Sequence, residues 1–220
     1  MTSDAITTTK RPKIILVTDP AYKEERILEV IEACVSALPP RSFAVQLRDK
    51  RREKPALREL AERLRAITKP LGTGGDALLL INGDAELARE VKADGVHLGG
   101  SSMSVEQARG IFGPGAFITI AAHSDKAVKL GADDGADGAL VSAIFASPGK
   151  AAGRGVEAIR SARAVSNPHF ALYGLGGVDR TNAAECILAG ADGIAAIRAL
   201  LLASDPGAEA RALYDSLHAT

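Results

Sequence analysis

The chain has 220 residues, 46% of them hydrophobic, which is long enough and apolar enough for the buried core of one large domain. Its 27 Lys and Arg residues balance 27 Asp and Glu residues, and only a short run near Arg51 is basic, which argues against a nucleic-acid partner. Two distant cysteines, Cys34 and Cys186, argue against a disulfide framework or a metal cage and predict reduced core residues of a cytoplasmic protein.

In chain order, the first segment is a polar stretch that lacks the apolar core of a signal peptide. We expect residues 1–12 to form a flexible tail. No apolar run of the sequence approaches membrane-spanning length, so we expect a soluble protein with no membrane partner.

Apolar runs then alternate with amphipathic patterns along residues 13–220. We expect eight strands, at residues 14–18, 43–47, 77–81, 95–98, 117–121, 139–144, 170–175 and 194–197. Helical periodicity stands between them, for example at residues 24–38, 55–67, 105–112 and 181–189. This alternation predicts a parallel sheet covered by helices, and eight units fit a single compact (β/α)8 TIM barrel. A doubly wound sheet is the alternative, but it normally has a glycine-rich turn after its first strand, where this chain has Thr18-Asp19-Pro20.

The tripeptide ADG occurs three times, at residues 93–95, 136–138 and 191–193. Each copy follows a helical stretch and precedes an apolar run. Repetition of this kind predicts that the chain reuses one βα unit or a pair of them.

In such a barrel the chemistry lies at the carboxyl ends of the strands. The segment VQLRDK places Gln46, Arg48 and Lys50 on one face by the two-residue period of a strand, which suits phosphate or pyrophosphate. Lys50 is also compatible with a solvated loop. Asn82, at the end of the third strand, could donate to a ligand oxygen or form a turn with Gly83.

Three further candidates follow the later strands. His123 is the best acid–base candidate of the four histidines, because imidazole can accept and donate a proton near neutral pH, although it could instead cap the next helix. His97 lies within a strand and is compatible with a core role. In the loop after the sixth strand, Lys150 could reach a phosphate or simply add surface charge. After the last two strands, backbone amides could bind a phosphate at Gly176, Gly177, Ile197 and Arg198.

Together, ILVTD, VQLRDK, INGDAELA, ADGVHLGG, AAHS, IFASPGK with GRGV, and GLGGV through GADGIAAI resemble the thiamine-phosphate synthase/TenI family of (β/α)8 barrels. In that family the synthase joins a pyrimidine pyrophosphate to a thiazole phosphate and uses Mg²⁺, whereas TenI is a thiazole tautomerase. The resemblance implies that the pyrimidine pyrophosphate is bound by Gln46, Arg48, Lys50, Asn82 and Lys150. It implies that the thiazole phosphate is bound by Gly176, Gly177, Ile197 and Arg198, where Arg198 replaces the usual serine. His123 matches the histidine implicated in the tautomerase.

The chain departs from the synthase at the two aspartates that hold Mg²⁺, which are replaced here by Gly83 and Ser102. Neither residue offers the anionic oxygen that Mg²⁺ prefers. The basic residues for pyrophosphate persist, however, and Asp84 or Asp49 could act as a substitute ligand.

We therefore expect a TenI-like thiazole tautomerase with a small phosphorylated thiazole substrate, no metal ligands and no cofactor. The alternative is a thiamine-phosphate synthase, which would need Mg²⁺. A third hypothesis is a non-catalytic protein that binds thiazole phosphate. These patterns do not determine the oligomeric state, so a homodimer stays open.

Overall fold

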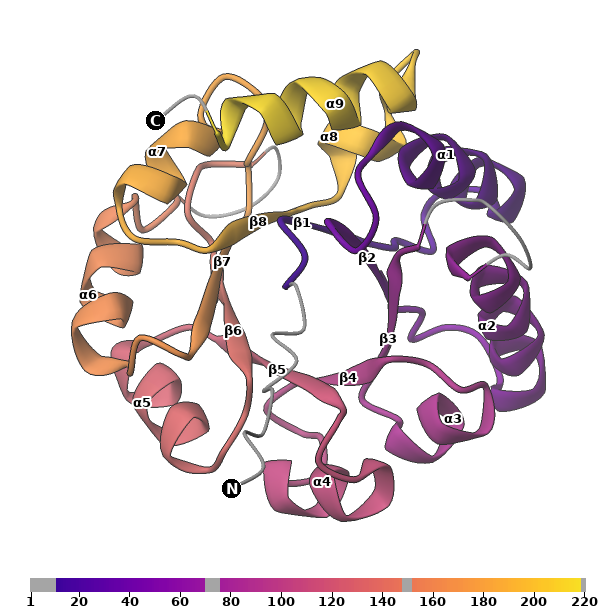
Figure 1. Cartoon of the computed structure of the whole chain (residues 1–220), viewed down its shortest axis with the longest axis horizontal. Helices are drawn as coiled ribbons and strands as arrows, with labels where there is room; N and C mark the ends of the chain where they lie inside the picture. The colour runs from indigo at the N-terminus through magenta and orange to yellow at the C-terminus, as the bar shows by residue number, and fades with distance from the viewer. Residues whose placement is uncertain (1–10, 70–75, 148–151, 219–220) are drawn as a thin grey trace, which may run out of the picture.

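The computed structural model describes residues 11–69, 76–147 and 152–218, and in it eight parallel strands form a closed barrel (Figure 1). Each strand pairs with the next along the chain and β8 pairs with β1, which confirms the predicted (β/α)8 barrel. The strands are β1 (Ile14–Val17), β2 (Phe43–Leu47), β3 (Leu78–Asn82), β4 (Gly95–Leu98), β5 (Phe117–Ala122), β6 (Gly138–Ser142), β7 (Ala171–Leu175) and β8 (Gly193–Ala196).

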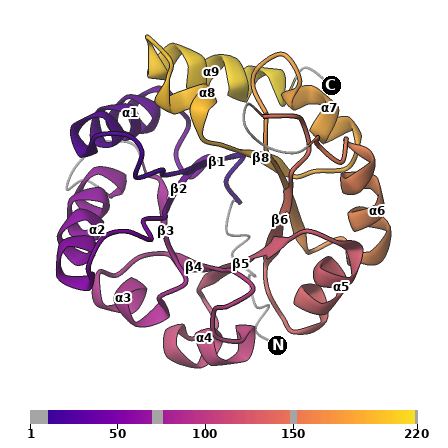
Figure 2. The same ribbon diagram turned by 180° about the vertical axis from the view of Figure 1, so that it is seen from behind.

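The helices form a ring outside the barrel, as both faces of the molecule show (Figures 1 and 2). They are α1 (Glu24–Ala37), α2 (Lys54–Thr68), α3 (Ala85–Glu90), α4 (Val105–Phe112), α5 (Asp125–Asp133), α6 (Glu157–Val165), α7 (Ala183–Leu188), α8 (Arg198–Leu201) and α9 (Pro206–Ser216). The last unit has two helices, the short α8 and then α9, which packs against α1. None of the helices in the described ranges is long and apolar enough to cross a bilayer. The cytoplasmic location stays a prediction.

The N-terminal boundary of the barrel lies close to the predicted one. Of the expected flexible tail, residues 1–10 lie outside the described residues. Arg11 and Pro12 are described: Pro12 is buried, and the Arg11 guanidinium donates to the backbone carbonyl of His169. These two residues therefore belong with the barrel.

Apolar side chains fill the barrel from inside and join it to the helices from outside. The inner cluster consists of Ile15, Val17, Ala44, Leu78, Leu140, Ala171, Tyr173 and Ala195. Cys34 and Cys186 lie in the outer layer between strands and helices, where burial raises the pKa of each thiol to about 12. Both cysteines are unpaired, so the prediction of separate core thiols is confirmed.

The aspartate of each ADG copy joins a strand to a helix through the same two contacts. The carboxylates of Asp94, Asp137 and Asp192 each accept a backbone N–H from the strand before, at 2.9, 2.7 and 2.9 Å. Each also pairs with an arginine of the preceding even-numbered helix: Arg65 of α2, Arg109 of α4 or Arg163 of α6, at 2.6, 2.8 and 2.5 Å. The repeating unit is therefore a pair of βα units, one of the two forms that the sequence predicts.

The glycine of each ADG copy is required by the approach of a neighbouring strand. A Cβ on Gly95 would lie 1.9 Å from the carbonyl oxygen of Phe117, and a Cβ on Gly138 would lie 2.5 Å from that of Ala171. No side chain fits at these distances.

Candidate active site

The carboxyl ends of the eight strands meet at one mouth of the barrel, and two amides stand together there. Gln46 of β2 is buried, and its Nε2 donates to Oδ1 of Asn82, the last residue of β3, at 3.1 Å. Its Oε1 is buried and has no hydrogen-bond partner among the residues that the structure describes. A buried acceptor without a donor is one that a ligand N–H or O–H can satisfy. Gly83 follows with φ +78°, so Asn82 and Gly83 also form the predicted turn.

Arg48 is held at the same mouth by a residue that the sequence analysis did not single out. The Thr18 hydroxyl accepts from the Arg48 backbone N–H at 2.8 Å and donates to its carbonyl at 3.1 Å. Arg48 is half-buried and lies close enough to His97 to act on its charge. Burial first, and then the Arg48 charge, lowers the pKa of His97 to about 4.

His97 is a neutral residue of the barrel interior. It is buried, and its Nδ1 lies 3.0 Å from the Thr119 hydroxyl on β5. With this pKa the imidazole carries no charge at neutral pH. The structure therefore supports the core role for His97.

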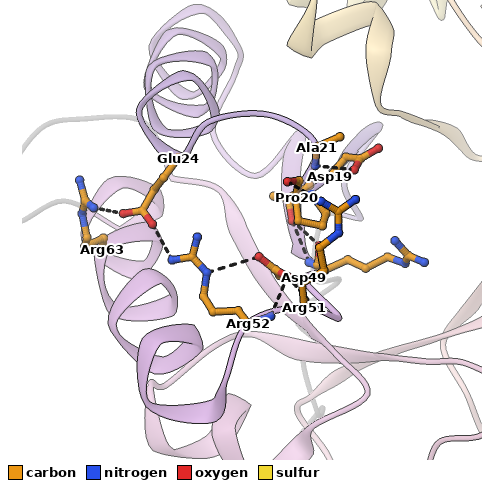
Figure 3. A network of polar contacts seen from close by, with 10 residues as sticks. Asp19, Pro20, Ala21, Glu24, Asp49, Arg51, Arg52 and Arg63 are labelled. Atoms are coloured by element: carbon orange, nitrogen blue, oxygen red, sulfur yellow. Dashed lines mark hydrogen bonds and ion pairs between the residues drawn. The ribbon is translucent and has the colours of Figure 1, made fainter.

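The loop after β2 is organised around Asp49 (Figure 3). One carboxylate oxygen of Asp49 accepts from the amides of Arg51 and Arg52, at 2.9 and 3.1 Å, and the other pairs with the Arg52 guanidinium at 3.3 Å. Arg52 in turn pairs with Glu24 of α1 at 2.6 Å. Because β2 ends at Leu47, the two-residue period does not extend to Lys50, which is exposed in this loop.

His123 directly follows β5 and faces the end of β6. Its Nδ1 lies 3.1 Å from the hydroxyl of Ser142 and 3.3 Å from the carbonyl oxygen of that residue. The ring is exposed, so its Nε2 side is accessible to a substrate. The next helix, α5, is capped by Ser124, whose hydroxyl accepts from the Ala127 amide at 3.2 Å. Helix capping therefore does not explain His123, and its position leaves a proton-transfer role available.

Two loops at the ends of β7 and β8 form the candidate phosphate site. Gly176 and Gly177 have φ of +105° and +65°, and a Cβ on Gly177 would lie 2.5 Å from the Ala146 carbonyl oxygen. These glycines are thus required by backbone conformation and by the packing of the β6–α6 loop. The amides of Gly177 and Arg198 have no acceptor within the described part of the chain, so both could bind an anion. Ile197 is the residue before α8.

Arg198 also lines a second, smaller pocket beside the candidate phosphate site. This pocket measures about 280 Å³ and lies between the β7–α7 loop, α8 and α9, where Asp179, Arg180 and Glu209 also line it. Lys150, the remaining predicted ligand, lies outside the described residues.

The residues at this mouth do not fit a carboxylate-held Mg²⁺. Ser102 accepts the Gly99 amide at 2.9 Å, and its hydroxyl lies 3.4 Å from where a Cβ on Gly83 would stand. Of the two substitute ligands, Asp84 caps α3 and pairs with Lys54 at 3.2 Å. Asp49 already binds two backbone amides and the Arg52 guanidinium. The described ranges contain no group of three or more His, Cys, Asp or Glu side chains that could hold a metal ion.

Fold and site together define a (β/α)8-barrel protein with polar strand ends and a candidate anion site between its last two strands. The chain belongs to the thiamine monophosphate synthase family, whose sequence profile matches residues 14–200. It is 35% identical over 202 residues to the putative thiamine-phosphate synthase of Geobacter sulfurreducens, covering 91% of this chain and 92% of that one. It is 36% identical over 199 residues to the thiamine-phosphate synthase of Gloeobacter violaceus, where it covers 89% of this chain but 54% of the relative. The chain thus spans about half the length of that relative.

Among solved structures, the thiamine phosphate pyrophosphorylase from Pyrococcus furiosus is similar with a TM-score of 0.80 and 27% identity, covering 94% of this chain and 95% of that one. The predicted family is confirmed, and with it a place in thiamine biosynthesis. Because these relatives are named synthases, the comparisons favour the synthase, our alternative, over the tautomerase that we placed first.

Proposed function

We propose that this chain catalyses the synthase reaction, in which a pyrimidine pyrophosphate is joined to thiazole phosphate and pyrophosphate is released. The observation that carries the proposal is the similarity to the putative Geobacter synthase along nine tenths of both chains. Amides at β7 and β8, and the Gln46, Asn82 and Arg48 group at β2 and β3, supply one anchor for each substrate.

These residues would act by position and charge. The amides of Gly177 and Arg198 would bind the phosphate of the thiazole, and the free Oε1 of Gln46 would accept a hydrogen bond from the pyrimidine substrate. Negative charge grows on pyrophosphate as it leaves, and the guanidinium of Arg48, whose backbone is held by Thr18, would stabilise it. Holding two substrates in reacting order removes much of the entropic barrier of a bimolecular reaction.

A second candidate is the thiazole tautomerase, and a specific observation favours it. Gly83 and Ser102 leave the mouth without the two carboxylates, while His123 stands against Ser142 with its ring exposed. Aromatisation of the thiazole moves a proton from a ring carbon to the exocyclic carbon, and an imidazole can accept and return it.

One experiment separates the hypotheses. The purified protein is given both synthase substrates, and in parallel the thiazole tautomer alone, each with Mg²⁺ and with a chelator. With Mg²⁺ present we expect thiamine phosphate and pyrophosphate in equal amounts, with coupling much slower in Arg48→Gln and retained in His123→Gln. Conversion of the tautomer without any coupling would establish the second candidate, and binding without either turnover would establish the non-catalytic hypothesis.

A further inference from the structure

The opposite, N-terminal mouth of the barrel opens into a pocket of about 1060 Å³. Its walls come from the segments that precede the strands, including Lys13 before β1, Asp94 before β4 and Asp192 before β8. Pockets that hold small molecules in proteins typically measure about 300–1,000 Å³. The mouth is therefore large enough for a metabolite, and no role in the proposed reaction accounts for it.

The charge of this pocket is positive after its ion pairs are considered. The three aspartates of the ADG copies line it, but each is paired with an arginine that does not. Five Lys and Arg residues also line the pocket, and Arg41 pairs with Asp76. The other four, Arg11, Lys13, Lys69 and Lys92, make no ion pair with a carboxylate of the described residues. Lys13 donates to the carbonyl oxygen of Asp192 at 3.1 Å, which leaves its charge uncompensated. An anion in the pocket would therefore meet several unpaired cations, and each aspartate of the pocket already has an arginine partner.

The pocket also has an aromatic wall with an unused hydroxyl behind it. Phe117 lines the pocket, and its ring and that of Tyr173 are nearly perpendicular with centroids 6.5 Å apart. Tyr173 is 0% exposed, and its hydroxyl has no hydrogen-bond partner in the described part of the chain. Burial and then Asp192 raise the pKa of Tyr173, while Arg11 lowers it, so this hydroxyl lies near residues that line the pocket. A buried hydroxyl without a partner is costly, and a ligand atom that reached it would remove that cost.

We propose that this pocket is a second ligand site, for a small phosphorylated molecule that carries a flat ring. The phosphate would lie among Lys13, Arg11 and the two exposed lysines, and the ring would pack on Phe117. The site is independent of the reaction at the carboxyl mouth, so it stands whichever of the candidate functions is established.

Adenosine monophosphate is a suitable probe, with adenosine and inorganic phosphate as its uncharged and ringless counterparts. Backbone amide NMR shifts locate binding by residue. We expect adenosine monophosphate to shift the amides of Lys13 and Phe117, and to bind more tightly than either counterpart. Lys13→Gln should weaken binding about tenfold or more, the usual effect of losing one charged contact. Lys129→Gln, which alters an exposed ion pair on α5 outside the pocket, should bind as the parent does.

Two outcomes would overturn the proposal: shifts confined to the amides around Gly177, and adenosine binding as tightly as its phosphate. Because Lys13 also bonds the Asp192 carbonyl, its variant could fail to fold. Lys69→Gln, at an exposed position of the pocket, then supplies the test, and unchanged affinity in that variant would equally refute the site.

Discussion

We predict that mild acid destabilises this fold through one side chain, His97. It is 5% exposed, and burial, followed by the Arg48 charge, lowers its pKa from 6.5 to about 4. As the pH falls through this window, the unfolded chain binds a proton that the folded protein does not, so the folded state loses stability progressively from pH 6.5 down to 4. Between pH 7 and pH 5 these two values correspond to a loss of about 2 kcal/mol from this residue.

The assay is urea denaturation of the parent and of His97→Gln at both pH values. Gln can still bond the Thr119 hydroxyl but does not titrate, and the carboxylates titrate alike in both proteins. The parent should therefore lose about 2 kcal/mol more than the variant. Thr119→Val, which removes the hydrogen bond and keeps the imidazole, should retain the parent's pH dependence. Equal losses in the parent and in His97→Gln would refute the reasoning.

Further predictions concern an ADG aspartate, the candidate phosphate site and His123. Asp137→Ala, which deletes the acceptor of a backbone amide and an arginine, should lower the free energy of unfolding by about 1–3 kcal/mol. Asp133→Ala, at an exposed pair, should cost less than about 0.5 kcal/mol by the same denaturation assay. Gly177→Ala, whose Cβ would lie 2.5 Å from the Ala146 carbonyl oxygen, should weaken thiazole phosphate binding at least tenfold in calorimetry. Gly115→Ala, whose Cβ would meet no neighbouring atom within 4 Å, should leave that binding unchanged. Under the tautomerase hypothesis, His123→Gln should slow turnover about 10²–10⁴-fold with binding unchanged; a normal rate would exclude His123 as the proton carrier.

The strands could be predicted because a strand buried on both faces is a continuous apolar run. Residues 43–47 and 95–98 were placed without error, and the other strand ends moved by only one or two residues. The sixth predicted strand, residues 139–144, instead begins one residue earlier and ends at Ser142, where the chain turns to pack on the β7 loop. The helix predicted at residues 181–189 is shorter in the structure, where α7 runs from Ala183 to Leu188.

Some positions of the candidate site could be predicted from the strand ends, but their contacts could not. Gln46 and Asn82 were expected at one mouth, and the structure joins them. Ser142 was missed as the partner of His123, because 19 residues separate them and only the β5–β6 pairing brings them together. The contacts of Asp49 with Arg51 and Arg52 likewise depend on the fold of the loop after β2, where the two-residue period of a strand no longer applies.

The two mouths of the barrel satisfy their polar groups in different ways. At the N-terminal mouth, each ADG carboxylate holds both a strand amide and an arginine, an arrangement repeated three times that ties helices to strands. At the carboxyl mouth, the Gln46 oxygen and the Gly177 amide remain without partners among the described residues. An unpaired buried group such as the Gln46 oxygen destabilises a fold, so it persists where a ligand completes it. At the N-terminal end the Tyr173 hydroxyl, like two guanidinium nitrogens of Arg65, is also buried without a partner among the described residues, and it lies behind the Phe117 wall of the proposed second site.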